Sequence, residues 1–288
     1  MKITRLAALL AVPAALSLAA CGGGSTSTFV NNATQGTAQV RFVQGDPKLG
    51  AVDIYFYQSN ASQPANATKT SVAFGEATDY TPQTAVPNTL VARAPGQTSG
   101  AAITACNLPA ITNTFYSVVI ADQNGAPNCM VFQDSPYTNA PQYRMHHAAS
   151  IAVANNSSLG TIDYGVGTAA AAFTVQGTST LGGFVGSQNP VTLAGTSGNQ
   201  AAASGTVFGI GPSSAAVGST DTATASLAAS AVFAPDSLTQ PDTAGTLNFA
   251  PYVGTSLYAI DCTGPITGGS VAIPCNGGVA LIGVFDTK

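Results

Sequence analysis

The two histidines of the chain, His146 and His147, are by type the side chains best suited to transfer protons or bind a metal ion near neutral pH. They are adjacent, and neighbouring side chains on a strand point to opposite faces. A strand therefore cannot easily direct both rings at one metal ion. We interpret both as packing or hydrogen-bonding residues, and we predict no metal site.

The carboxylates are the second group that could carry chemistry. Glu76 is the only glutamate, with Asp79 close in sequence, but a glycosidase needs two carboxylates flanking the scissile bond, and nothing else marks a cleft. Asp53 and Asp163 each lie between apolar residues, so we expect them to face the polar side or to accept hydrogen bonds from turns. A cation site with Asp46 or Asp79 is the alternative, but no loop has the dense acidic spacing of a calcium site.

Motifs for nucleophilic catalysis or phosphate binding are missing from the sequence. No G-x-S-x-G segment lies where a strand would turn into a helix, as a serine hydrolase requires. The glycine-rich segments 209–211 and 264–269 lack the P-loop lysine and the dinucleotide spacing. We therefore predict no catalytic residue, no cofactor and no enzymatic activity.

Four cysteines follow Cys21, namely Cys106, Cys129, Cys262 and Cys275. An even number in an exported chain predicts disulfides, and four cysteines allow three pairings. We predict the pairs Cys106–Cys129 and Cys262–Cys275, because each pair brackets one predicted hairpin. A zinc site is the alternative, but no pair has the tight spacing of a zinc knuckle.

The first residues predict export. Lys2 and Arg5 precede an apolar run at 6–20, which at about 15 residues is too short for a comfortable membrane span of about 20. The segment Leu18-Ala19-Ala20-Cys21 resembles the lipobox of bacterial lipoproteins, in which the cysteine carries the lipid. An ordinary secreted protein is the alternative.

This resemblance implies a signal peptide at 1–20, a lipidation site at Cys21 and attachment to a membrane through that lipid. Gly22, rather than an aspartate, follows the cysteine, which by the same resemblance favours the outer membrane of the cell envelope. The segment 21–36 is rich in Gly, Ser and Thr and is predicted to be a flexible tether.

The composition narrows the class of partner. Charged residues make up only 7% of the chain, far below the usual quarter. Loss of 1–20 removes two of the eight basic residues and none of the twelve acidic ones, so the net charge changes from −4 to −6. A negative net charge argues against nucleic acid as a partner, because its binding requires a dense basic surface.

Short apolar blocks separated by Gly, Pro, Asn and Ser predict many short strands, and no long segment has a convincing helical period. We therefore predict an all-β fold. The clearest blocks are 38–42, 51–57, 115–121, 129–132, 151–154, 172–175, 256–260 and 279–285. The alanine-rich segment 223–233 is also predicted to be a strand.

The two halves of the chain resemble each other in a shared order. The segment 41–45 (RFVQG) matches 144–148 (RMHHA), and Asp53 and Asp163 follow in similar strands. The later matches pair 72–75 with 182–185 and 113–116 with 254–258, where Tyr116 corresponds to Tyr258. A cysteine-closed hairpin is expected to end each half.

The motif Arg41-Phe42-Val43-Gln44-Gly45-Asp46-Pro47, followed by Ala51-Val52-Asp53-Ile54-Tyr55, Phe74-Gly75 and Tyr80, resembles domain of unknown function 4397. The resemblance covers 38–135 well and 143–288 weakly, where a Ser/Gly/Thr-rich insertion intervenes near 186–222. It implies two tandem immunoglobulin-like β-sandwich domains, at 37–142 and 143–288, in an envelope protein. The family supplies no activity.

A contact surface is the last candidate site. Tyr55, Tyr57, Tyr80, Tyr137 and Tyr143 could line one, although half-buried strand positions are the simpler interpretation. We predict a non-catalytic envelope module for surface display, assembly or adhesion, whose partner is an envelope protein or glycan. The alternative is a glycan or small-molecule binding protein that uses loops at the end of a sandwich. That alternative requires an aromatic-lined groove, whereas a contact module requires a flat apolar patch.

Overall fold

The structure is a computed structural model that describes residues 37–84, 86–108, 115–135, 142–182, 187–188, 191–192, 205–233, 252–267 and 272–287. The predicted signal peptide, Cys21 and the predicted tether lie outside these residues. The described chain is mostly β-strand, with the α-helix α1 (Ser150–Asn155) and the 3-10 turns Ser157–Leu159 and Ala229–Ala231. The predicted all-β class is confirmed. Among the described residues, no helix is long and apolar enough to cross a membrane.

The strands form four sheets. The first outer sheet contains β3 (Lys69–Val72), β2 (Val52–Gln58), β5 (Asn88–Arg93) and β6 (Thr104–Leu108). The first inner sheet contains β12 (Ser187–Gln188), β8 (Ala126–Asp134), β7 (Phe115–Gln123), β1 (Thr37–Gln44) and β4 (Thr81–Thr84). The second inner sheet contains β13 (Val191–Thr192), β9 (Gln142–His147), β17 (Tyr252–Asp261) and β18 (Val279–Thr287). The second outer sheet contains β15 (Thr220–Thr222), β11 (Ala172–Thr180), β10 (Thr161–Ala169), β14 (Val207–Pro212) and β16 (Ala225–Ala228).

The strand order repeats between the two halves. In the first inner sheet β1 pairs parallel with β7 and antiparallel with β4, and in the second β9 pairs parallel with β17 and antiparallel with β13. Arg41 lies opposite Ser117 on β7, and Arg144 lies opposite Ser256 on β17. The match of Arg41 with Arg144 is therefore confirmed. The alignment of Tyr116 with Tyr258 is wrong by three residues, because the register pairs Ser117 with Ser256.

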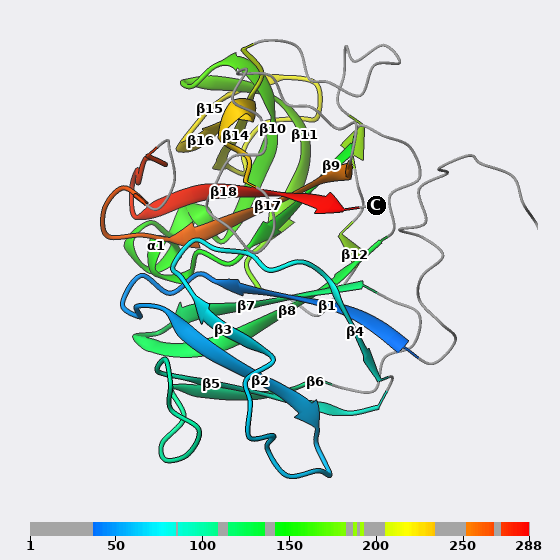
Figure 1. Cartoon of the computed structure of the whole chain (residues 1–288). Helices are drawn as coiled ribbons and strands as arrows, with labels where there is room; N and C mark the ends of the chain where they lie inside the picture. The colour runs from blue at the N-terminus through cyan, green and yellow to red at the C-terminus, as the bar shows by residue number, and fades with distance from the viewer. Residues whose placement is uncertain are drawn as a thin grey trace, which may run out of the picture.

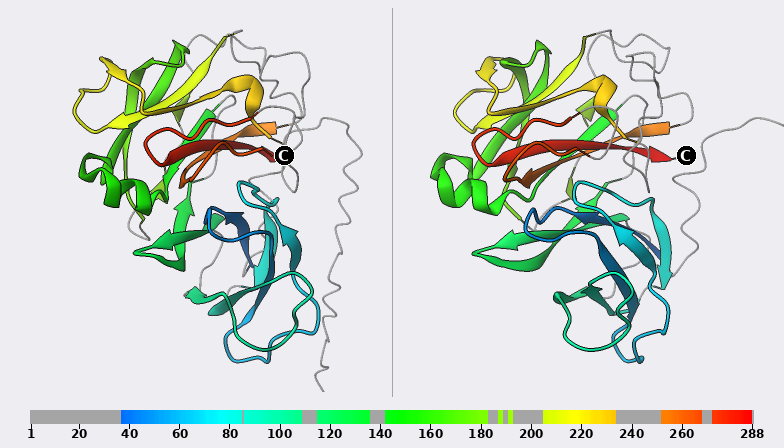
Figure 2. Two further views of the ribbon diagram at one scale, coloured as in Figure 1. Left: turned by 90° about the vertical axis from the view of Figure 1, so that its left-hand side faces the viewer. Right: turned by 60° about the vertical axis from the view of Figure 1, so that its left-hand side comes forward.

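The four sheets are stacked, with the two inner sheets facing each other at the centre (Figure 1). The turned views show the same layers, with the first half of the chain below and the second half above (Figure 2). One hydrophobic cluster fills the space between the first outer and first inner sheets, where Val40 and Phe42 meet Ile54 and Leu90. Alternate residues of these strands face the space between the two sheets, so the sheets pack as a β-sandwich.

A second cluster continues across the centre of the stack. It joins Val119 and Phe132 of the first inner sheet to residues such as Leu257 and Phe208 of the second half. The two halves therefore share a hydrophobic core. Their division into two domains at residue 142, and their immunoglobulin type, stay predictions.

Two predicted strands differ in the structure. The segment 151–154 lies in the helix α1, and only 225–228 of the segment 223–233 is a strand, followed by a 3-10 turn. The helix begins beside Asp261 of β17, whose carboxylate accepts hydrogen bonds from the main-chain N–H groups of Ile151 and Ala152, both at 2.8 Å. A carboxylate at this position stabilises the first turn of a helix, and here it comes from a distant strand.

Candidate functional site

The two histidines point in opposite directions from β9, as strand geometry predicts. His146 is buried, with Nε2 at 2.6 Å from Asp134 Oδ1 and Nδ1 at 3.0 Å from the main-chain oxygen of Leu257. Both ring nitrogens therefore lie within hydrogen-bond distance of an oxygen. His146 thus belongs to an ion network inside the fold.

His147 is satisfied by the chain around α1. Its Nε2 lies 2.5 Å from the main-chain oxygen of Leu159, and its Nδ1 accepts from the main-chain N–H of Ala149 at 3.4 Å. Burial lowers the pKa of His147 to about 4, although the bond to Leu159 opposes this shift. The ring is therefore neutral near pH 7 and holds the turn that precedes β10.

A buried ion network occupies the interface between the two inner sheets. Arg41 pairs with Asp286, which also lies 3.3 Å from Arg144 Nη2, and Arg144 Nη1 lies 3.8 Å from Asp134 Oδ1. All four side chains are fully buried. Asp286 also accepts a hydrogen bond from Ser256 Oγ at 2.8 Å.

The neighbouring rings and hydroxyls complete this network. Tyr80 donates to Asp134 Oδ2 at 2.7 Å, and its ring lies 4.2 Å below the Arg41 guanidinium. The hydroxyl oxygens of Ser117 and Tyr258 lie 2.8 Å apart, and this hydrogen bond links the two halves of the chain. Burial would raise the pKa of Asp134, but the charges of His146 and Arg144 and the hydrogen bonds from His146 and Tyr80 lower it to about 2.

The network repeats with the fold. Arg41 and Arg144 occupy equivalent positions on β1 and β9. Asp134 lies opposite Phe115, and Asp286 lies opposite Gly254, two residues before Ser117 and Ser256 respectively. Each half therefore contributes one arginine and one aspartate to the same layer. Sequence reasoning did not identify these four charges as a group, although the repeated arginine was visible.

The remaining candidate carboxylates accept main-chain hydrogen bonds. Asp53 accepts from Ser71 N and Gly96 N, both at 2.7 Å, and Asp163 accepts from Ser214 N at 3.1 Å and Ala215 N at 3.0 Å. These contacts match the interpretation that both aspartates bind turns. Asp46, Glu76 and Asp79 accept from Lys48 N, Ala73 N and Tyr80 N respectively. Within the described residues, no three His, Cys, Asp or Glu side chains gather as metal ligands.

The predicted tyrosine surface is not formed as a group. Tyr55 and Tyr143 are buried, and their hydroxyls donate to Gln97 O at 2.9 Å and to Gln176 Oε1 at 2.5 Å. Tyr57 and Tyr80 are half-buried, and Tyr137 lies outside the described residues. The simpler interpretation holds for the described members of this set.

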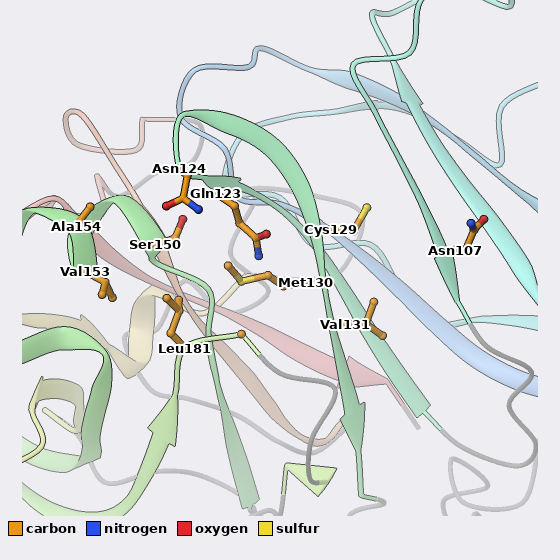
Figure 3. A pocket seen from close by; sticks show the side chains of 11 residues that line it. Asn107, Gln123, Asn124, Cys129, Met130, Val131, Ser150, Val153, Ala154 and Leu181 are labelled. Atoms are coloured by element: carbon orange, nitrogen blue, oxygen red, sulfur yellow. The ribbon is translucent and has the colours of Figure 1, made fainter. Parts of the chain in front are cut away.

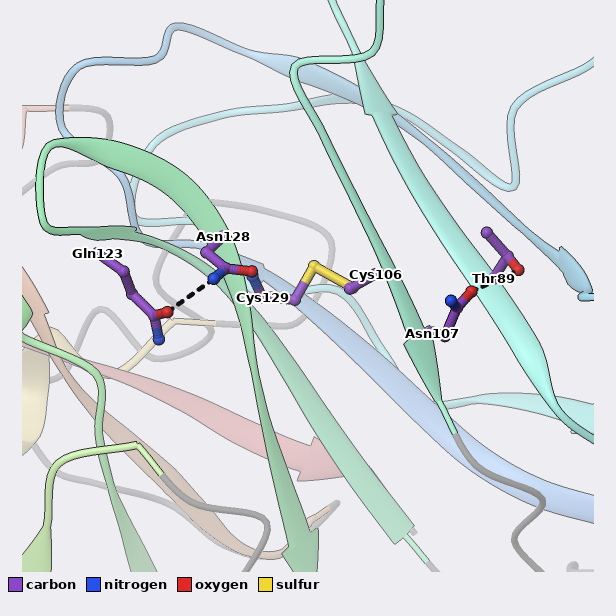
Figure 4. Close-up of a disulfide and its surroundings, with 6 residues drawn as sticks. All are labelled: Thr89, Cys106, Asn107, Gln123, Asn128 and Cys129. Atoms are coloured by element: carbon purple, nitrogen blue, oxygen red, sulfur yellow. Dashed lines mark hydrogen bonds between the residues drawn. A yellow bond between two sulfur atoms is a disulfide. The ribbon is translucent and has the colours of Figure 1, made fainter.

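Both predicted cysteine pairs are at disulfide distance, with Cα separations of 6.1 Å for Cys106–Cys129 and 5.8 Å for Cys262–Cys275. The second bond closes the connection between β17 and β18. The first does not close a hairpin as predicted, because Cys106 lies on β6 of the outer sheet and Cys129 on β8 of the inner sheet. It fastens the edges of the two sheets together (Figure 4).

A cavity of about 690 Å³ opens beside this first disulfide, at the junction of the two halves (Figure 3). We name it the β8 cavity. Its described lining residues are all uncharged, and they come from β6, the β7–β8 hairpin, α1 and the end of β11. They are Asn107, Gln123, Asn124, Cys129, Met130, Val131, Ser150, Val153, Ala154, Leu181 and Gly182. The volume is within the range of ligand pockets.

Two amide side chains in the β8 cavity are oriented by hydrogen bonds outside it. Asn107 Oδ1 accepts from Thr89 Oγ1 at 2.9 Å, and Gln123 Oε1 accepts from Asn128 Nδ2 at 2.8 Å. The amide nitrogens are the ends of Asn107 and Gln123 that these bonds leave free (Figure 4). The lining therefore combines amide N–H groups that can donate to a bound partner with apolar side chains such as Met130 and Leu181. No sequence motif indicated it, because its walls come from segments far apart in the chain.

Comparison with known proteins does not name a family. The sequence matches no family model and no curated protein. One solved structure that it resembles is entitled "Crystal structure of Putative cell adhesion protein from Parabacteroides distasonis ATCC 8503"; the match has 8% sequence identity and covers 88% of this chain and 99% of that chain. Its TM-score of 0.19 does not establish a shared fold.

Proposed function

We propose that this chain is a non-catalytic lipoprotein of the cell envelope that acts by contact with a partner, in surface display, assembly or adhesion. The contact site is the β8 cavity, which is concave, unlike the flat apolar patch that the sequence led us to expect of a contact module. One observation carries the proposal: the candidate catalytic groups are held by internal hydrogen bonds, whereas the solvent-open cavity is lined by uncharged residues. A site lined by uncharged residues can bind a partner without catalysing a reaction.

The location part of the proposal rests on the sequence alone. The lipobox-like segment ending at Cys21 supports a lipid anchor, and Gly22 supports the outer membrane. The resemblance to domain of unknown function 4397 supports a location in the cell envelope. In this account the membrane is reached only through the lipid, and the tether joins the lipid to the folded part.

The intact mass of the protein extracted from membranes tests the anchor. A mass that fits a chain beginning at Cys21 plus acyl groups, with no free thiol before reduction, is the expected result. A Cys21→Ser variant should be released from the membrane fraction with its disulfides unchanged. An unacylated wild-type chain in the supernatant would refute the lipoprotein.

The contact part needs a separate test. Cells with and without the gene are compared for cell-to-cell aggregation and for attachment to a surface, together with cells that carry the Cys21→Ser variant. We expect cells without the gene and cells with the Cys21→Ser variant both to lose aggregation and surface attachment. Unchanged contact in cells without the protein would contradict a role in adhesion.

A further inference from the structure

The open edge of β8 is the feature that points to a ligand. On the side away from β7, β8 pairs with β12 at Gln133 and Asp134. On that same side, residues 126–132 have no strand partner among the described residues. An edge strand offers unpaired N–H and C=O groups to an incoming chain. The β8 cavity lies along this edge, since Cys129, Met130 and Val131 line it.

The turn before β8 determines which main-chain groups face outward. Asn124 and Gly125 have φ of 56° and 88°, the geometry of a two-residue hairpin turn of type I′. The residues flanking such a turn, Gln123 and Ala126, bond to each other. The alternation of an antiparallel pair then turns the groups of Pro127, Cys129 and Val131 away from β7.

Two residues on this edge agree with that assignment. Pro127 lacks an N–H, which is tolerated because the group would face away from the sheet. The N–H of Cys129 donates to the side chain of Asn128 at 2.8 Å. The first part of the edge is thus blocked, and Val131 is the position whose N–H and C=O both face the cavity.

The lining of the cavity favours a peptide over a sugar. The amide nitrogens of Asn107 and Gln123 can donate to main-chain oxygens, and Val131, Val153 and Leu181 can contact apolar side chains. No charge lies among the described lining residues, which favours an uncharged partner. They also include no aromatic ring, on which a sugar face could pack.

From this geometry we infer that the β8 cavity binds an extended, uncharged peptide segment of another envelope protein, which adds as a strand to β8 at Val131. This inference rests on the proposed function and names the partner class. At its far end the same edge already pairs with β12, at Gln133 and Asp134. Main-chain hydrogen bonds supply affinity in this mode, and side-chain pockets supply specificity.

Hydrogen exchange at the Val131 amide tests the inference. The full folded chain is mixed with a library of short capped peptides composed of Ala, Val, Thr, Ser and Asn, and with the same library N-methylated at every residue, so that neither edge of the peptide keeps a donor. We expect exchange at Val131 to slow by about tenfold with the first library and not with the second. N-methylation removes the donors that strand addition requires.

Two variants provide the controls. Ala154→Trp fills the cavity from the exposed face of α1 and should abolish the protection, whereas Ala61→Trp, in the exposed loop after β2, should leave it intact. Equal protection by both libraries, or protection only by a neutral oligosaccharide, would overturn strand addition. If peptides fail but Ala154→Trp still reduces cell contact, the proposed function stands and this inference falls.

Discussion

Replacement of Asp286 by leucine separates the contribution of the buried ion network from that of the surrounding core. The carboxylate of Asp286 pairs with Arg41, lies 3.3 Å from Arg144 and accepts from Ser256. Its loss leaves Arg41 fully buried with the main-chain oxygen of Phe285, the Tyr80 ring and the Tyr258 hydroxyl as its remaining contacts among those described. Removing one partner of a buried pair costs about 3–5 kcal/mol, because the other charge stays desolvated.

The double variant Arg41→Met with Asp286→Leu is the matched control. It removes both charges and leaves Arg144 beside Asp134 and the main-chain oxygen of Ser135. Replacement of both partners by apolar residues is often close to neutral, so we expect the double variant to recover more than half of the loss. Urea unfolding at pH 7, followed by tyrosine fluorescence, measures the free energy of unfolding in each case. A loss below about 1 kcal/mol for Asp286→Leu, or additive losses in the double variant, would refute this reasoning.

Three further predictions concern other parts of the fold. The pKa of His147 is lowered to about 4, so the neutral ring contributes fully to the free energy of unfolding above pH 6.5, and this contribution is lost as the pH falls toward 4. In urea unfolding at a series of pH values, a His147→Gln variant should lose about 3 kcal/mol of this pH dependence. A variant whose pH profile equals that of the wild type would contradict the prediction. Gly165→Ala places a Cβ atom against the main-chain oxygen of Thr174 and should lower the free energy of unfolding by about 2–4 kcal/mol, whereas Gly50→Ala meets no atom within 4 Å and should leave it unchanged; equal effects would refute the close approach. Cys262→Ser with Cys275→Ser opens a loop of 13 residues and should cost about 3 kcal/mol, measured by thermal unfolding, with no loss expected if the pair is reduced in the native protein.

The sequence was sufficient for the parts of the fold that depend on local pattern. Short apolar blocks between turn residues predicted β1, β2, β7 and β18, and the repeated arginine matched β1 with β9. The apolar run at 151–154 failed as a strand because its helix depends on Asp261, which lies more than 100 residues further along the chain. Local pattern carries no information about such a partner.

For the candidate sites, too, local sequence pattern predicted some features and missed those that depend on residues far apart in the chain. The hydrogen-bonding roles of Asp53 and Asp163 followed from their positions within strands. Local sequence pattern could not predict the ion network or the β8 cavity. Arg41 pairs with Asp286, and β6 and α1 line one cavity, only after the sheets have stacked. The first disulfide illustrates the limit: the pairing was correct, but the bond joins two sheets rather than closing one hairpin.

Cell contact by the Ala154→Trp variant is the most direct test of a binding role for the β8 cavity. Cells that carry this variant are compared with cells that carry Ala61→Trp or the wild-type chain, at equal amounts of anchored protein. The account predicts that Ala154→Trp reduces aggregation and attachment to the level of cells without the protein, while Ala61→Trp retains the wild-type level. Wild-type contact by Ala154→Trp cells would contradict the assignment of the cavity as the contact site.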